Sequence, residues 1–431
     1  MKKSTIFIVI VFLLVSLKVY SQSNSEKPIT YPFSVLFKKA YQSYPDVPTG
    51  LLEAVAFTMT HIHHIDSTTS GSCMGIPRVY GVMGLTLDGK GYFRNNLLLV
   101  SQISGFKVND IIDNPEINIR AYASAYSALK KQLGINSINI EQQISIIKAL
   151  SEIPDNLRNE FALNSYIYAV ITFLNNTENQ SAYTFPNYQI DMTHIFGVDK
   201  YKILSSPQVT IRRNTQQTGT SEGHDTISAF EIQSTDYPPA IWNPAASCNY
   251  AVGRTAAISA VAIHDTEGSY SGTISWFQSC PCPTGCTTAS ACSGYRPCNT
   301  GASSAHYVIR SSDGQVTQMV SEADKAYHIG SENGYTIGIE HEGYCSQTGW
   351  YSNAMYSSSA NLVKDICNSG YGISPTSTYS GSACSCSQSS SACLQSSAIK
   401  IKGHQMFPNQ THFDPGINWD WAKYYNRVFM N

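Results

Sequence analysis

Residues 257–268 read AISAVAIHDTEG, an apolar run that ends on His264 and continues into a short polar segment. A compact apolar run of this length, bounded by turn residues, predicts a buried β-strand. Strand-like runs recur further along the chain, at residues 306–310, 315–319 and 335–340, and a helical pattern covers 357–368. Strands that alternate with helices predict an α/β C-terminal domain with a central mixed β-sheet flanked by helices.

The histidine at the end of the first strand has candidate partners near the C-terminus. His404 follows a glycine, and His412 and Asp414 precede a Pro415-Gly416 turn. His264, His404 and Asp414 offer two imidazoles and one carboxylate, a ligand set that binds Zn²⁺ and leaves a fourth position for water. An open position is typical of hydrolytic zinc. The residues alone therefore predict a zinc-dependent hydrolase with these three metal ligands.

The N-terminal half has a different pattern. Over residues 30–175, apolar residues recur at three- and four-residue spacing, which predicts a mostly α-helical domain. The periodicity fades over residues 176–235, and the polar stretch from Thr210 to His224 is rich in Thr, Gln and Gly, as in a linker. The expected organisation is multidomain, with the α/β domain at residues 236–431.

The first 21 residues predict export. A basic start is followed by an apolar run from Thr5 to Leu17 and by compact residues up to Ser21, which is the pattern of a signal peptide. The run of about 13 residues is short of the roughly 20 needed to span a bilayer. We expect a secreted or periplasmic monomer without a membrane anchor. The net charge of −2 over 431 residues argues against nucleic acid as a partner.

Eleven of the twelve cysteines lie beyond residue 240, and most of them fall in two segments, 279–300 and 381–396. In an oxidising compartment such cysteines predict disulfide bonds. A structural zinc site is the alternative, but the spacings do not repeat as CxxC pairs. Cys73 stands alone in the N-terminal half and is a candidate free thiol. The two segments precede candidate site residues, so they either shape the rim of a cleft or only stabilise the fold.

Residues 236–426 resemble the amidase-2 family, which are zinc-dependent N-acetylmuramoyl-L-alanine amidases related to peptidoglycan-recognition proteins. The matching motifs occur in the family's order. They are YPPAIWNPA at 237–245, AIHDTEGSY at 262–270, SAHYVI at 304–309, AYHIG at 326–330, IGIEHEG at 337–343, Gly403-His404 and Asp414-Pro415-Gly416. The resemblance implies that the substrate is peptidoglycan and that the bond cleaved is the amide between N-acetylmuramic acid and L-alanine of the stem peptide.

The resemblance also implies roles for single residues. His264, His404 and Asp414 would hold the zinc, and Glu340 would accept a proton from the attacking water. Glu342 lies on the same strand face as Glu340, because strand side chains alternate, and it is the alternative base or a substrate-binding residue. His328, in the AYHIG motif, matches a family position near the substrate, and a purely structural role is equally open for it. His341 should point the other way and has no expected chemistry.

Two positions depart from the family pattern. Many relatives place a lysine two residues before the last metal ligand, where its charge stabilises the oxyanion, and this chain has His412 there. We expect His412 to stabilise the oxyanion as a donor, with activity that falls as the pH rises through the pKa of its imidazole. Some relatives have a tyrosine just before the residue that matches His306. Here it is Ala305, so no tyrosine role is expected.

Residues 35–135 resemble the lysozyme-like fold of lytic transglycosylases, through GLLEAVA at 50–56, YGVMGL at 80–85 and DNPEINI at 113–119. Those enzymes carry an essential glutamate in the first helix. Here its position is Met59, which cannot protonate a glycosidic oxygen, and Glu53 lies further upstream. We expect a non-catalytic domain that binds glycan. No metal is expected at the sequence HIHH, residues 61–64. His61 and His63 would lie on the same side only in a strand, and this segment has a helical context.

Two other functions stay open at this stage. One is a non-catalytic peptidoglycan-binding protein, which is disfavoured because no zinc ligand is missing. The other is a glycan-cleaving enzyme that acts through the N-terminal domain, which is disfavoured by the missing acid. The new ends left in digested peptidoglycan would distinguish all three functions.

Overall fold

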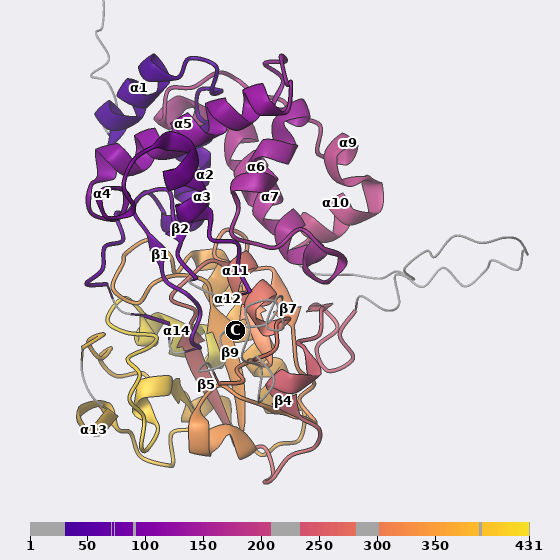
Figure 1. Cartoon of the computed structure of the whole chain (residues 1–431). Coiled ribbons are helices and arrows are strands. Elements are labelled where there is room, and N and C mark those ends of the chain that lie inside the picture. Colours follow the sequence, from indigo (N-terminus) through magenta and orange to yellow (C-terminus); the bar gives the residue numbers. More distant parts are fainter. Residues whose placement is uncertain are drawn as a thin grey trace, which may run out of the picture.

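The computed structural model describes residues 31–430, apart from 70, 73, 89–91, 208–232, 282–300 and 388–389. In Figure 1 the indigo-to-magenta helical region lies above the orange-to-yellow α/β region. The predicted signal peptide, the stretch from Thr210 to His224, Cys73 and the cysteines between 282 and 298 lie outside the described residues. None of the helices in the described part of the chain is both long and apolar enough to cross a membrane.

The N-terminal region is mostly helical, as predicted. Its helices are α1 (Ser34–Ser43), α2 (Leu51–Thr60), α3 (Asn96–Ser104), α4 (Val108–Asp113), α5 (Pro115–Gln132), α6 (Ile144–Leu150) and α7 (Glu160–Asn175), with a short antiparallel pair, β1 (Val79–Tyr80) and β2 (Leu85–Thr86). The start of α5 illustrates the local cause. Asn114 accepts hydrogen bonds from the backbone N–H groups of Glu116 and Ile117, and Pro115 takes the first helical position, where its missing N–H is harmless.

The helical region continues beyond its predicted end. The stretch 176–235 was expected to be a linker, but α8 (Thr177–Ala182), α9 (Met192–Phe196) and α10 (Val198–Leu204) fold its first part. Helices of five to seven residues are too short for a clear apolar period. Their signal is instead in the caps, since Asn176 and Asp191 accept hydrogen bonds from the first turns of α8 and α9.

The C-terminal region is built on the predicted mixed sheet. Its strands are β3 (Ile241–Trp242), β5 (Ala260–Asp265), β6 (Tyr307–Ile309), β7 (Val316–Gln318), β9 (Thr336–His341) and β10 (Ile401–Gly403). Among the described residues their order is β10-β5-β9-β6-β7-β3, and β4 (Tyr250–Ala251) pairs separately with β8 (Lys325–Ala326). Strands β10, β5, β9 and β6 run parallel, whereas β7 returns antiparallel to β6 through the predicted turn. His264 on β5 and Glu340 on β9 are therefore register partners on adjacent strands.

The two faces of the sheet differ. On one face, Val261, Ile263, Ile337 and Ile339 pack against α12 (Asn353–Asn368) and α14 (Trp421–Phe429). Helix α13 (Ser390–Cys393) lies in the loop before β10. His264 and Glu340 point to the opposite face, because side chains alternate along each strand. Small residues line part of that opposite face, where Ala260 and Ala262 pack against Ile329 and Phe407.

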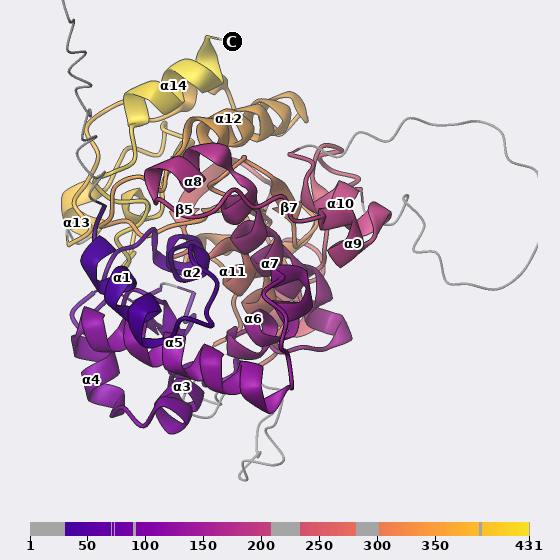
Figure 2. The same cartoon turned by 90° about the horizontal axis from the view of Figure 1, so that it is seen from above.

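The helical region packs on the same face as His264. Helix α11 (Tyr270–Phe277) shares one continuous hydrophobic core with α2, α5 and α7 and with Val308 of the sheet. The indole N–H of Trp276 donates to the carbonyl of Met74 at 2.9 Å, and Ser275 donates to Asn159 at 2.8 Å. Figure 2 shows α7 next to α11 in the view from above. The two regions are therefore joined by a buried interface.

Some of the predicted disulfide bonds lie within the described residues, between Cys248 and Cys280 and between Cys384 and Cys393. Cys345 and Cys386 are free thiols that approach each other at Gly416. Gly416 has a φ of 72°, and a Cβ there would lie 2.3 Å from Sγ of Cys386. Only glycine fits this position, which follows directly on the Asp414-Pro415 turn.

Candidate active site

Three side chains converge where β5 ends and where β10 continues into the C-terminal loop. His264 comes from β5, His404 follows β10 directly, and Asp414 lies in the loop after it. Nδ1 of His264 lies 2.9 Å from Oδ2 of Asp414, and Nδ1 of His404 lies 3.0 Å from Oδ1. All three side chains are buried. The structure thus brings together the three residues that the sequence indicated as metal ligands.

The ring nitrogens that face away from Asp414 also have partners. Nε2 of His264 lies 2.9 Å from Nδ1 of His328, whose Nε2 lies 3.2 Å from Oγ1 of Thr336. The Thr336 hydroxyl donates onward to the carbonyl of Glu332. This direction requires each imidazole to donate through Nε2, which leaves Nδ1 of His264 unprotonated and free to bind a metal. His328 therefore orients His264, and Gly338 makes room for its ring, because a Cβ there would lie 2.5 Å from it.

His404 is oriented in the same way. Its Nε2 lies 2.9 Å from Oε1 of Gln410, and the Gln410 amide donates to the carbonyl of Pro408. An amide oxygen can only accept, so Nε2 of His404 carries the proton and Nδ1 faces Asp414 as a lone pair. Gln410 was not among the expected site residues. No local pattern in the sequence distinguishes Gln410 from Gln405, which also lies between His404 and His412.

The chemistry of the three side chains fits a cation. Within the described residues, Nδ1 of His404 and Oδ1 of Asp414 are buried without a well-formed hydrogen bond. Burial alone raises the pKa of Asp414, but positive charge beside it, as on protonated His404 or His264, brings it well below its ordinary value. Burial lowers the pKa of His264 to about 4. A carboxylate and neutral imidazoles that direct unprotonated atoms at one point are the donor set that Zn²⁺ prefers.

Glu340 lies next to this cluster. Its Oε1 is 3.9 Å from Nδ1 of His264, and in the part of the chain that the structure describes neither carboxylate oxygen has a hydrogen-bond partner. Burial, and then the charge of Asp414, raise the pKa of Glu340 well above its ordinary value. A buried carboxyl group without partners is destabilising. Its position beside the metal-ligand cluster is what a general base would need.

A cavity of about 330 Å³ borders the cluster at His404, and we call it the metal cleft. Its walls include His328, His404, Gln410 and His412, and also Met74 from the helical region. The ring centroid of His412 lies 5.2 Å from that of His404. Burial, and then the neighbouring His404, lower the pKa of His412. Its charged form is thus confined to a lower pH than in an exposed histidine, and near neutral pH His412 can donate only through its neutral N–H.

Glu342 is held away from the metal ligands. Its two oxygens accept hydrogen bonds from the backbone N–H groups of Tyr270, at 2.8 Å, and Ser311, at 2.7 Å. It stabilises the start of α11, so the geometry favours Glu340 over Glu342 as the base. His341 points to the opposite sheet face, where it contacts the carbonyl of His264 and the hydroxyl of Ser359. It supports the backbone that carries a metal ligand.

A second group of possible metal ligands among the described residues is Asp265, Glu267 and Cys345. Hydrogen bonds already engage its members. Asp265 contacts the hydroxyl of Tyr351 at 2.6 Å, and Glu267 accepts from the backbone N–H of Cys345 at 3.1 Å. We interpret this group as a support for the loops beside the cleft.

The helical region shows no free acid at the position that lytic transglycosylases use. Met59 is buried. Glu53 is buried as well, and its oxygens accept hydrogen bonds from the hydroxyls of Tyr31, at 2.6 Å, and Tyr41, at 2.5 Å. A carboxyl group engaged in this way is not available to a glycosidic oxygen. His61 stacks on Trp350, with ring centroids 3.5 Å apart, so it packs at the interface between the regions.

Comparisons with known proteins identify the family of the C-terminal region. The profile of the Amidase_2 family, described as N-acetylmuramoyl-L-alanine amidase, matches residues 253–417. A curated relative, N-acetylmuramoyl-L-alanine amidase A of Achromobacter lyticus, is 40% identical over 195 residues, which are 45% of this chain and 95% of the relative. The chain therefore belongs to the family of N-acetylmuramoyl-L-alanine amidases, and the resemblance of its C-terminal region is confirmed.

Solved structures give a weaker likeness. The catalytic domain of XlyA is 13% identical and aligns over 44% of this chain and 98% of its own, with a TM-score of 0.25. The endolysin LysCS of Clostridium intestinale URNW is 16% identical and aligns over 40% of this chain and 83% of its own, with a TM-score of 0.23. Scores this low support no statement about this chain. The lysozyme-like resemblance of the helical region stays a prediction.

Proposed function

We propose that this protein is a zinc-dependent N-acetylmuramoyl-L-alanine amidase that acts on peptidoglycan outside the cytoplasm. The observation that carries the proposal is the convergence of His264, His404 and Asp414 on one point, with Glu340 beside them. The two imidazoles would bind zinc through Nδ1 and Asp414 through its carboxylate. When bound, zinc would polarise the scissile carbonyl and lower the pKa of a water molecule.

The residues of the chain account for the remaining steps. Glu340 would take the proton of the attacking water and pass it to the leaving nitrogen of L-alanine. The N–H of His412 would donate to the oxyanion of the tetrahedral intermediate. His328 and Gln410 would keep the two ligand imidazoles in the required tautomer.

The export signal predicted in residues 1–21 supports action outside the cytoplasm, and the disulfides agree with an oxidising compartment. The helical region would be a non-catalytic partner of the amidase domain. Its occupied Glu53 and its Met59 support this assignment.

Digestion of purified peptidoglycan tests the proposal. The expected products carry new L-alanine amino termini and no new reducing sugar ends. EDTA should abolish the release of amino termini, and added Zn²⁺ should restore it. New reducing ends would point to glycan cleavage by the helical region, and binding without new ends of either kind would point to a non-catalytic receptor. Either of these two results would overturn the proposal.

A further inference from the structure

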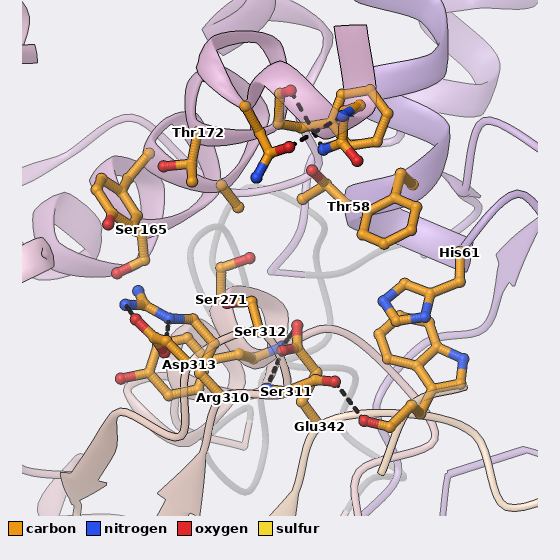
Figure 3. Close-up of a pocket in the computed structure, with 18 residues that line it drawn as sticks. Thr58, His61, Ser165, Thr172, Ser271, Arg310, Ser311, Ser312, Asp313 and Glu342 are labelled. Carbon is orange, nitrogen blue, oxygen red and sulfur yellow. Dashed lines mark hydrogen bonds and ion pairs between the residues drawn. The ribbon is translucent and has the colours of Figure 1, made fainter. Parts of the chain in front are cut away.

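A second cavity, of about 270 Å³, lies between the helical region and the α/β region, and we call it the interface slot. Figure 3 shows its two walls. Helix α2 supplies Thr58 and helix α7 supplies Ser165 and Thr172, and the opposite wall comes from the start of α11 and the loop after β6. Its size is near the lower end of ligand sites, which are roughly 300–1,000 Å³, so it suits one small ring.

Arg310 forms the floor of the interface slot and has an unused donor. Its side chain is 3% exposed and lies between the rings of Tyr168 and Tyr270, at 5.0 and 5.5 Å. Nε donates to Asp313 at 2.9 Å, and Nη2 donates to Asp313 and to the carbonyl of Leu204. Nη1 is buried and has no hydrogen-bond partner among the described residues. A buried charged donor without an acceptor is unfavourable. A ligand oxygen that accepts a hydrogen bond from Nη1 would remove this cost.

The hydroxyl of Ser165, on the facing helix α7, is a second buried polar group without a hydrogen-bond partner among the described residues. Thr58, Thr172 and Ser271 add further hydroxyl groups around the slot. A ligand that both donates and accepts hydrogen bonds would satisfy these groups.

The charged side chains in the described lining of the slot are already paired, so the slot does not favour an ion. Asp313 balances the charge of Arg310, and both oxygens of Glu342 are already held by backbone N–H groups. Apolar surface comes from the rings of Phe57 and Tyr168. An uncharged ring with hydroxyl groups at its edge, apolar C–H faces and a carbonyl acceptor matches this lining.

The slot and the metal cleft share one face of the sheet. Glu342, which lines the slot, follows Glu340 by two residues, and its backbone N–H still bonds to Ile309 of β6. Two residues of strand cover about 7 Å and return to the same face. The slot therefore begins about 7 Å along the strand from Glu340, on the side of the sheet that carries the proposed metal ligands.

We propose that the interface slot binds one N-acetylated amino-sugar residue of the glycan strand, with the acetamido carbonyl on Nη1 of Arg310. The proposal rests on the proposed function for the identity of the polymer, but the site itself is independent of the metal. It gives the helical region a role, since neither region forms the slot alone.

Calorimetric titration of the full chain, stripped of metal with EDTA, tests the proposal directly. We expect chitotriose, a trimer of N-acetylglucosamine, to bind with a Kd of roughly 1 mM, an affinity suited to one small polar fragment. Cellotriose lacks acetamido groups and should bind about tenfold more weakly or not at all. No saturable binding of chitotriose, or equal binding of both trimers, would overturn the proposal. The titration needs no metal, so chitotriose binding can be observed even if the proposed amidase activity is not found.

Two variants locate the binding. Ala169→Leu places a larger side chain in the slot and should weaken chitotriose binding about tenfold or more, whereas Asn164→Leu adds leucine to α7 outside the slot and should not. Arg310→Lys keeps a cation beside Asp313 but removes Nη1, so it should abolish the preference for chitotriose. Thermal unfolding checks that each variant is folded. Unchanged affinity in folded Ala169→Leu, or an unchanged preference in folded Arg310→Lys, would show that the sugar binds elsewhere.

Discussion

The metal cleft and the interface slot lie on one face of the same sheet, but they are assembled differently. The cleft takes its ligands from strand ends and one loop of the α/β region, at His264, His404 and Asp414. The slot takes its walls from helices and loops more than 100 residues apart, as with Ser165 and Arg310. The proposed metal ligands therefore belong to one region, whereas the slot exists only because two regions pack together. Substitutions should separate the two sites cleanly.

The largest expected effect comes from removing a metal ligand. His264→Ala should reduce amidase activity by about a thousandfold or more, because two remaining ligands hold zinc poorly and the carbonyl loses its Lewis acid. Zinc content, measured by elemental analysis of the purified protein, should fall in parallel. His194→Ala, at an exposed position of α9, is the matched control. Sugar binding in the slot should persist in His264→Ala, and its loss would show that the two sites are not separate.

Glu340→Gln should lower kcat by about 10²–10⁴-fold, the usual contribution of a general base. The amide keeps the size of the side chain, so zinc content should stay at one ion per chain. Glu178→Gln, on the exposed start of α8, serves as the control. If Glu340→Gln retained full activity with bound zinc, the proton acceptor would have to be sought elsewhere in the cleft.

His412→Ala should lower kcat by about 10²-fold, because one oxyanion donor is removed. His412→Lys should restore most of the activity, since lysine is the residue that many relatives place at the corresponding position. Steady-state kinetics on a soluble muropeptide would separate kcat from KM. A change in KM alone would assign His412 to substrate binding.

Gln410→Ala should weaken zinc binding by about 10–100-fold, as expected when an outer partner of a ligand histidine is lost. Competition with a chelator measures this affinity, with exposed Gln142→Ala as the control. At saturating zinc, the kcat of Gln410→Ala should return close to that of the parent protein. A kcat that stays low would mean that Gln410 also touches the substrate.

The smallest expected effect concerns the interface between the regions. Burial lowers the pKa of His61 to about 3 from its ordinary 6.5, so below pH 6.5 the unfolded chain binds a proton that the folded chain does not. The free energy of unfolding should therefore decrease from pH 6.5 towards 3, by about 1–3 kcal/mol from this residue. Chemical denaturation at several pH values measures it. His61→Phe, which keeps the stack on Trp350, should flatten the slope, and exposed His194→Phe should not.

The sequence allowed the α/β fold to be predicted because each strand is a short apolar run that carries its own signal. The short helices α8, α9 and α10 were missed, since each has too few residues for an apolar period. Within the site, the proposed metal ligands could be selected from the sequence as scarce residue types in recognisable motifs, and the structure brings them together. Gln410 was not, because glutamine is common and only its distance to His404 gives it a role.

The sequence by itself determined the class of the chemistry. His264, His404 and Asp414 offer the donor atoms that zinc prefers, and the C-terminal region matches the amidase family. Only the tertiary structure decided which groups share a site. Packing turned His328 into a support for His264, tied Glu342 to α11, and left Nη1 of Arg310 without a partner among the described residues. These outcomes depend on distances between segments far apart in the chain, which local sequence patterns do not encode.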